Sequence, residues 1–100
     1  MDVGHLFANK GGDNWSTGRF IKQYRRRMIA VHLHDVVLRE GMAPLDHQKL
    51  GSGALDYRQL ARQLAESGYE GCVAAEIKSS MEDARQSARM FEQAVSALAP

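Results

Sequence analysis

The feature that most limits how this chain can fold is the apolar segment over residues 28–31, which leads directly into His32-Leu33-His34-Asp35. Imidazole and carboxylate groups at the end of an apolar strand indicate a functional site, because parallel α/β folds bind ligands at the carboxyl ends of their strands. Asp2-Val3-Gly4-His5 and Cys72-Val73-Ala74-Ala75-Glu76 follow a similar pattern. Three such segments predict one metal site built from several parallel strands.

The remaining pattern alternates extended and helical segments. Residues 1–8 are predicted to be the tail of a strand and its following loop, and residues 28–34 and 72–77 to be strands. Helical patterns separate and follow these segments, so the fold class is α/β with parallel strands and right-handed helical crossovers. Residues 35–54 read as a long loop, and loops of this length are usually functional or mobile.

Capping residues mark the ends of the predicted helices. Asp13 or Asn14 can begin a helix that continues to about residue 26, and Asp56 can cap the next helix, which Gly68 ends. Ser79 and Glu82 have the spacing of a capping box. The apolar stripe that follows predicts a final helix packed against the core, and it consists of Met81, Ala84, Ala88, Phe91, Val95 and Leu98.

Two further features have both a structural and a functional interpretation. Arg25-Arg26-Arg27 fits the last turn of a helix, where cations meet the negative end of the helix dipole, although a phosphate-binding role stays open. Cys72 lies inside an apolar strand and is interpreted as a packing residue rather than a nucleophile. Gly51-Ser52-Gly53 lacks the lysine of a phosphate loop and reads as a turn.

Composition excludes several classes of protein. The chain of 100 residues allows one domain at most, and its net charge of +1 gives no overall field for nucleic acid or an anionic membrane. A single cysteine excludes an internal disulfide and fits a reduced, cytoplasmic compartment. We expect no membrane span, because no apolar run approaches about 20 residues. We also expect no signal peptide, because no basic stretch followed by an apolar stretch opens the chain.

The residues at the predicted strand ends suit a transition metal. Mixed nitrogen and oxygen ligands favour Mn²⁺, Zn²⁺, Co²⁺ or Fe²⁺ over Ca²⁺. His32 and His34 share a face of their strand, so one can bind metal while the other contacts substrate or a ligand. An unpaired buried carboxylate is costly, which favours a role for Glu76, although pairing with Lys78 or an arginine is the alternative.

These motifs resemble the C-terminal part of the xylose isomerase-like TIM barrels, the superfamily of sugar phosphate isomerases and epimerases and of endonuclease IV. Asp2-Val3-Gly4-His5 is similar to the end of the sixth strand, and Val31-His32-Leu33-His34-Asp35 to the seventh. Residues 46–56 resemble the loop and cap before the seventh helix. Gly68-Tyr69-Glu70-Gly71 with Glu76 resembles the eighth strand. The resemblance covers residues 1–100 and implies part of a (β/α)8 barrel, with about two full strands, a strand stub and three helices.

The resemblance also implies roles for individual residues. A divalent metal (Mn, Co, Zn or Mg) would be held by Asp2, His32 and Glu76, and Glu76 would also act as the catalytic acid or base. Contacts with substrate are expected from His5, His34 and His47. His5 and His47 also match histidines that bind metal in the nuclease branch.

Some positions depart from the family pattern. The fifth-strand glutamate, a metal ligand, has no counterpart here. Leu45 replaces an aspartate that often precedes the matched His47, and Ser52 replaces a frequent glutamate. We therefore expect a barrel segment (a truncated product, an excised fragment or one part of a split enzyme) that is inactive alone. Self-association or a complementing barrel chain would cover its exposed sheet edges.

Three functions compete at this point. The first is a segment of a metal-dependent sugar or sugar phosphate isomerase or epimerase, which transfers a proton beside a carbonyl or hydroxyl that the metal binds. The second is a phosphodiesterase of the endonuclease IV type, against which Leu45 and the near-neutral charge speak. The third is a non-catalytic barrel remnant that serves as an interaction module.

Overall fold

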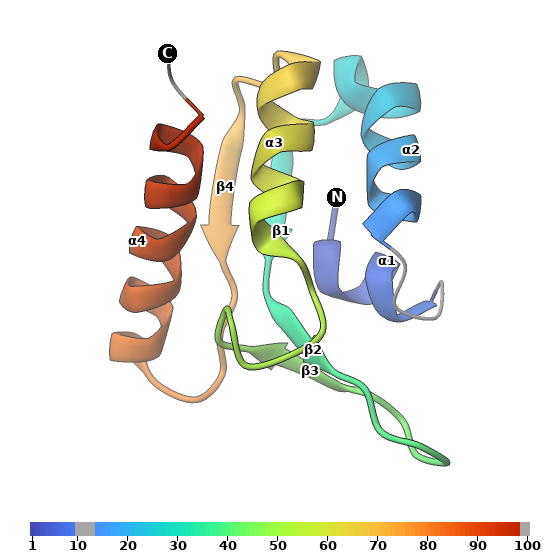
Figure 1. Cartoon of the computed structure of the whole chain (residues 1–100), viewed down its shortest axis with the longest axis vertical. Coiled ribbons are helices and arrows are strands. Elements are labelled where there is room, and N and C mark those ends of the chain that lie inside the picture. Colours follow the sequence, from blue (N-terminus) through green and yellow to red (C-terminus); the bar gives the residue numbers. More distant parts are fainter. Residues whose placement is uncertain (10–13, 99–100) are drawn as a thin grey trace.

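A computed structural model of the chain describes residues 1–9 and 14–98 (Figure 1). Helices and strands alternate along most of the chain, with one hairpin inserted after the first strand. The elements in order are α1 (Val3–Asn9), α2 (Asn14–Tyr24), the 3-10 helix η1 (Arg25–Arg27), β1 (Ala30–Leu33), β2 (Asp35–Val37), β3 (Leu45–Gln48), α3 (Tyr57–Ser67), β4 (Cys72–Ala75) and α4 (Met81–Ser96).

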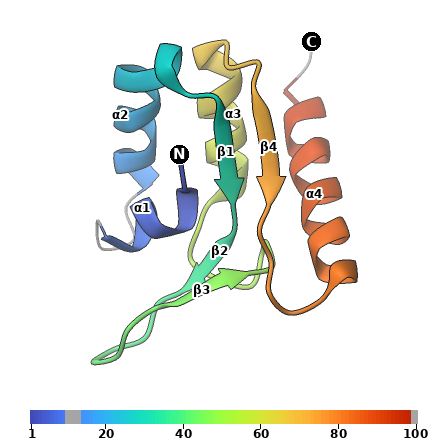
Figure 2. The ribbon, with the colours of Figure 1, turned by 180° about the vertical axis from the view of Figure 1, so that it is seen from behind.

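β1 and β4 form a parallel pair that positions the candidate site. The register runs from Ala30 opposite Cys72 to Leu33 opposite Ala75. Helix α3 lies behind the two strands in Figure 2, and α4 stands alongside β4. The predicted α/β class with parallel strands is therefore confirmed, and within the described residues the strands form an open arrangement rather than a closed barrel.

The prediction of a strand tail and loop over residues 1–8 is correct for the first two residues only. The N–H of His32 donates to the carbonyl of Met1 at 2.8 Å, and Asp2 forms an isolated parallel bridge with His32. Helix α1 then begins, because the Asp2 carboxylate accepts the N–H of His5 at 3.0 Å as a helix cap does. Val3 and Phe7 lie four residues apart and are both buried, which fixes the inner face of α1.

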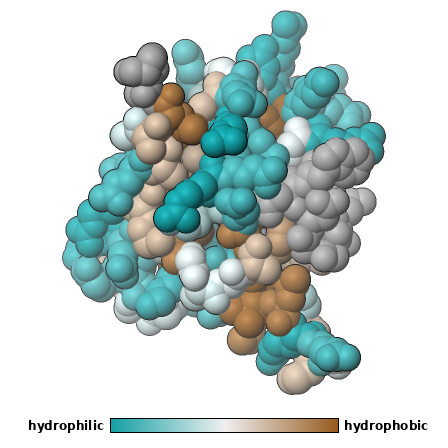
Figure 3. Space-filling model, viewed as in Figure 1, coloured by the Kyte–Doolittle hydropathy of each residue, from teal (hydrophilic) through white to brown (hydrophobic). Residues whose placement is uncertain are grey.

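The predicted loop over residues 35–54 contains an antiparallel hairpin formed by β2 and β3. Asp35 pairs with Gln48, and Val37 pairs with Leu45. The sequence does not predict this pairing, because β3 is mostly polar and lacks the alternation of polar and apolar residues that is typical of a half-buried strand. Gly41 lies in the hairpin connection at φ +69°. Figure 3 shows hydrophobic side chains gathered over the hairpin, where Leu38, Met42 and Leu45 are exposed.

A buried carboxylate holds the rest of this segment. Asp35 is fully buried and accepts the N–H groups of Val36, Gly51, Gly53 and Leu55 at 2.8 to 3.0 Å. The predicted turn at residues 51–53 is confirmed, and it wraps closely around this carboxylate. A Cβ atom at Gly53 would lie 2.2 Å from the carbonyl oxygen of Val36, so only glycine fits there.

The middle helices agree with their predicted boundaries. Helix α2 begins at Asn14 and continues through η1 to Arg27, whereas the other candidate cap, Asp13, lies outside the described residues. The arginines occupy the final turn as predicted, and Arg25 donates to the carbonyl of Ser67 at the end of α3. Asp56 caps α3 by accepting the N–H of Gln59, and Gly68 ends it at φ +76°.

The last strand and helix require corrections. Strand β4 ends at Ala75, and Cys72 is exposed, so the packing role predicted for its thiol is wrong. Ser80, rather than Ser79, caps α4 by accepting the N–H of Asp83. The predicted capping box of Ser79 and Glu82 is therefore wrong: the cap lies one residue further on, and the Ser79 hydroxyl donates to the Asp83 carboxylate.

The apolar stripe of α4 is only partly in the core. Phe91 is buried, whereas Met81, Val95 and Leu98 are exposed. The core itself lies between the strands and the helices that cover them, with Leu33, Leu60 and Leu64 among its buried members. None of the helices within residues 1–9 and 14–98 has the length and hydropathy needed to cross a bilayer.

Candidate metal centre

Asp2, His32 and Glu76 meet at the carboxyl end of the β1–β4 pair. His32 lies on β1, and Glu76 directly follows β4, where its N–H donates to the carbonyl of Leu33 at 2.9 Å. Asp2 is brought to the same end by its bridge to His32. One ligand atom from each of the three side chains lies within 4.8 Å of the others.

This set of side chains has the chemistry of a divalent metal site. Two carboxylates and one imidazole suit Mn²⁺, Co²⁺ or Zn²⁺. His32 Nδ1 lies 3.2 Å from Glu76 Oε1, and two ligands each about 2.1 Å from one ion would be separated by about 3.0 to 3.4 Å. The Glu76 side chain is 39% exposed, so the expectation of a buried carboxylate is wrong. Within residues 1–9 and 14–98, Glu76 pairs with His32 and not with Lys78 or an arginine.

The surroundings of Asp2 favour the ionised form of its carboxyl group. Burial opposes its ionisation, but hydrogen bonds from the backbone N–H of His5 and from His34, together with the nearby imidazoles, hold the pKa of Asp2 below its ordinary value. His34 Nε2 lies 2.7 Å from Asp2 Oδ1. Because a metal ligand must be deprotonated, this environment favours cation binding near neutral pH.

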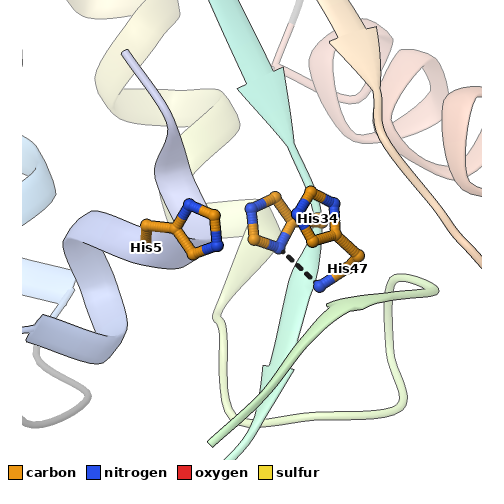
Figure 4. A group of neighbouring side chains, drawn as sticks. All are labelled: His5, His34 and His47. Atoms are coloured by element: carbon orange, nitrogen blue, oxygen red, sulfur yellow. Dashed lines mark hydrogen bonds between the residues drawn. The ribbon is translucent and has the colours of Figure 1, made fainter.

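The other three histidines form a second group beside the first (Figure 4). His5 comes from α1, His34 from the junction of β1 and β2, and His47 from β3. The rings of His34 and His47 are stacked, with centroids 4.2 Å apart and planes 7° apart. His5 meets both rings edge-on, at 4.9 Å from His34 and 5.3 Å from His47.

Asp46 completes this second group, and the sequence reasoning did not assign it a role. Its Oδ2 lies 2.8 Å from His5 Nε2 and 4.0 Å from His47 Nε2, and its Oδ1 lies 3.7 Å from Lys78 Nζ. The hydrogen bond from His5 and the neighbouring cationic groups lower the pKa of Asp46. In a regular strand the side chains of residues 46 and 47 would point to opposite faces, but His47 has φ +54°, which interrupts that alternation.

The structure therefore brings all six predicted site residues to one end of the strands, in two adjoining groups. Asp2 links the groups, because it lies among the ligand atoms of the first and within 2.7 Å of His34 in the second. His5 Nδ1 also lies 3.2 Å from Asp2 Oδ1. His34, a predicted substrate contact, is fully buried, so it differs from His5 and His47 in its access to solvent.

Parallel strands with helical crossovers and a polar site at their carboxyl ends define an α/β protein of the kind that builds TIM barrels. The family model of the xylose isomerase-like TIM barrels matches residues 1–94, so the chain belongs to this family. Inosose dehydratases from two strains of Klebsiella pneumoniae are 32% identical to the chain over 91 residues, an alignment that covers 78% of the chain. The chain spans 30% of the length of these relatives.

Proposed function

We propose that this chain supplies the metal ligands and the proton-transferring carboxylate of a sugar-converting enzyme of the xylose isomerase-like family. The observation that carries the proposal is the convergence of Asp2, His32 and Glu76 within 4.8 Å at the carboxyl ends of neighbouring strands. The substrate class is a sugar, a sugar phosphate or a related polyhydroxylated ketone. The overall reaction is isomerisation or epimerisation by proton transfer.

We assign a separate role to each side chain of the site. A divalent cation, when bound, supplies the Lewis acid that polarises a substrate oxygen. Asp2, His32 and Glu76 would hold the cation, and Glu76 would also take a proton from the carbon next to the substrate carbonyl and deliver it to the neighbouring carbon in an isomerisation. His5 and His47 are more accessible than His34 and face the same end of the strands, so they contact the substrate hydroxyls.

Dehydration is the second outcome of the same proton transfer. The Klebsiella relatives are inosose dehydratases, and loss of water beside a carbonyl begins with removal of a proton from the neighbouring carbon, as isomerisation does. The same Glu76 would take that proton. Dehydration would follow instead of isomerisation where a hydroxyl on the carbon next to the site of proton removal is protonated and leaves as water.

A chimaeric enzyme tests this proposal. Residues 1–94, the range that the family model matches, replace the corresponding barrel segment of the Klebsiella inosose dehydratase. NMR in D₂O follows both dehydration and the exchange of protons beside the substrate carbonyl. The proposal predicts turnover or exchange in the chimaera, with a loss of at least about 100-fold in the Glu76→Gln chimaera. Ser87→Ala, a buried change in α4 away from the site, serves as the matched control.

A folded, metal-loaded chimaera with neither activity would contradict the proposal. Equal activity in the Glu76→Gln chimaera would remove Glu76 from the chemistry. If His32→Ala and Glu76→Gln alter stability but no turnover is ever found, the chain is a barrel remnant with a non-catalytic role as an interaction module.

One observation favours the phosphodiesterase alternative. Leu45 removes the family's loop aspartate, but the structure brings the next residue, Asp46, to His5 and His47. A carboxylate with two imidazoles is a suitable additional metal site for phosphodiester cleavage. Metal-dependent cleavage of DNA that contains an abasic site, lost in Asp46→Ala, would support this alternative over the sugar enzyme.

We also propose that further barrel strands, or a second copy of the chain, cover the free edge of β4. An apolar groove of about 490 Å³ lies between β4 and α4, with Val73, Phe91 and Val95 in its lining. Analytical ultracentrifugation at micromolar concentration tests the second copy: a well-folded monomer would exclude it. A cytoplasmic location belongs to the same proposal, since the exposed thiol of Cys72 suits a reducing compartment.

A further inference from the structure

His34 is buried in the middle of the candidate site, and both of its ring nitrogens are engaged by the protein. It has no exposed surface. Its Nε2 lies 2.7 Å from Asp2 Oδ1, and its Nδ1 accepts the backbone N–H of His47 at 2.9 Å. The ring thus connects a predicted metal ligand, Asp2, on one side to the β3 strand on the other. Figure 4 shows the second of these contacts, between His34 and His47.

These two contacts fix the tautomer of the ring. A nitrogen that accepts an N–H has no proton of its own, so the Nδ1 of His34 is unprotonated. The neutral ring then has its proton on Nε2, which donates to the Asp2 carboxylate. Neither nitrogen keeps a free lone pair for a metal ion, and neither is available to substrate without breaking one of these hydrogen bonds.

The contact with Asp2 orients that carboxylate. Two donors meet the same oxygen, Oδ1: the His34 ring at 2.7 Å and the backbone N–H of His5 at 3.0 Å. The Nδ1 atom of the His5 ring also lies 3.2 Å from this oxygen. Within residues 1–9 and 14–98, no donor forms a hydrogen bond with the other oxygen, Oδ2. The carboxylate is therefore clamped through one oxygen, and the second oxygen remains for a cation.

The contact with His47 supports an unusual backbone. His47 has φ +54°, a conformation that costs free energy for a residue with a side chain. Its N–H donates to His34, its ring Nδ1 lies 2.9 Å from the carbonyl oxygen of Glu76, and its own carbonyl accepts the N–H of Lys78 at 3.2 Å. These contacts tie β3 to the end of β4 and leave Nε2 of the His47 ring facing the site.

Gly4 provides the space that the His34 ring needs. A Cβ atom at Gly4 would lie 2.1 Å from His34 Cε1 and 2.3 Å from its Nδ1. Such distances are far below van der Waals contact, so any side chain at residue 4 would displace the ring. The sequence Asp2-Val3-Gly4-His5 thus contains both the group that the ring orients and the position that accommodates the ring.

We infer that His34 is a positioning residue, which holds Asp2 in its metal-binding orientation and His47 in its left-handed conformation, and which contacts neither metal nor substrate. The part that concerns the metal rests on the proposed function. The part that concerns the tautomer and the His47 backbone holds for the metal-free chain as well, so the two can be tested separately.

The first test needs no variant. Long-range ¹H–¹⁵N NMR of the metal-free chain reports the tautomer of each histidine. The inference predicts a proton on Nε2 of His34, and a proton on its Nδ1 would overturn it. In the same sample, the His47 amide should exchange slowly with solvent, because it is hydrogen-bonded to a buried ring.

The second test compares variants by Co²⁺ calorimetry and by hydrogen exchange at the His47 amide. His34→Phe keeps an aromatic ring but loses both polar contacts, and it should weaken Co²⁺ binding by about 10-fold to 100-fold. The His47 amide should exchange at least about tenfold faster. His34→Gln offers an amide donor and an acceptor, so it should recover most of both properties.

Two more variants, Gly4→Ala and Ser87→Ala, are compared by the same calorimetry and hydrogen exchange. Gly4→Ala displaces the ring by contact, so it should reproduce the effects of His34→Phe although residue 4 has no side chain near the metal. Ser87→Ala removes a different buried hydrogen bond, to the N–H of Leu50, and should leave both readouts unchanged. A folded His34→Phe chain with wild-type Co²⁺ affinity and wild-type exchange at His47 would overturn the inference.

The outcomes separate this inference from the proposed function. If the wild-type chain binds no Co²⁺, the proposed metal site fails, while the tautomer and the exchange at His47 still decide the role of His34. If the wild-type chain binds Co²⁺ and His34→Phe binds it equally well, the metal site stands and the positioning role fails.

Discussion

Replacing Asp35 with alanine should greatly destabilise the segment that presents Asp46 and His47. The Asp35 carboxylate is fully buried. Its Oδ1 accepts the N–H groups of Val36 and Leu55, and its Oδ2 accepts those of two glycines in the turn at residues 51–53. The alanine side chain satisfies none of these donors.

The size of this loss in stability depends on whether the four N–H donors are buried or can reach water. Val36 and Leu55 are buried, so each amide that loses the carboxylate as its acceptor costs about 1 to 3 kcal/mol. The two glycine amides can reach water and contribute less. We therefore expect Asp35→Ala to lower the free energy of unfolding by about 4 kcal/mol, a large part of the roughly 5 to 15 kcal/mol typical of a domain.

Urea unfolding followed by circular dichroism measures this change through the linear dependence of stability on denaturant. Asp35→Asn should fall between wild type and Asp35→Ala, because its amide keeps one acceptor oxygen. Asp46→Ala is the control, since Asp46 is 40% exposed and its ion pairs contribute less than about 1 kcal/mol. A cost below about 1 kcal/mol for Asp35→Ala would refute the reasoning.

Three further predictions concern stability. First, the pKa of Asp2 is lower in the folded chain than in the unfolded chain, where it is about 3.9. Ionised Asp2 therefore stabilises the metal-free fold above that pH, and this stability is lost as the pH falls through the lower folded pKa. The melting temperature of wild type should fall more steeply with acid than that of Asp2→Asn, and equal slopes would contradict the prediction. Second, Ser80→Ala should cost about 1 kcal/mol through loss of the α4 cap, more than Ser79→Ala in the same urea assay; the reverse order would restore the predicted capping box. Third, Gly68→Ala should cost about 1 kcal/mol because of φ +76°, whereas an unchanged midpoint would show that the helix end relaxes.

The sequence was sufficient where local pattern and function coincide. Apolar segments that end in His32 and Glu76 predicted both the parallel strands and the site at their carboxyl ends, and the structure places these residues together. The cap at Asp56 and the stop at Gly68 are decided by neighbouring backbone groups, so they could be predicted from spacing alone.

The remaining features depend on contacts between distant residues. The β2–β3 hairpin consists largely of polar residues, and its pairing is supported by a carboxylate, Asp35, that binds amides about 16 to 20 residues away. Asp46 joins the site only because His47 adopts a left-handed backbone, which no pattern of polar and apolar residues indicates. Helix α1, in contrast, had a detectable signal in the Asp2 cap and the spacing of Val3 and Phe7.

The central claim is that Asp2, His32 and Glu76 together hold one divalent cation, and calorimetric titration of the metal-free 100-residue chain with Co²⁺ and Mn²⁺ tests it most directly. His32→Ala is the matched variant, because it removes one ligand from an exposed position on β1 and leaves the buried core intact. We expect saturable binding with one ion per chain in wild type and its loss in His32→Ala. A folded wild-type chain that binds no ion, or a His32→Ala chain that binds as tightly as wild type, would contradict it.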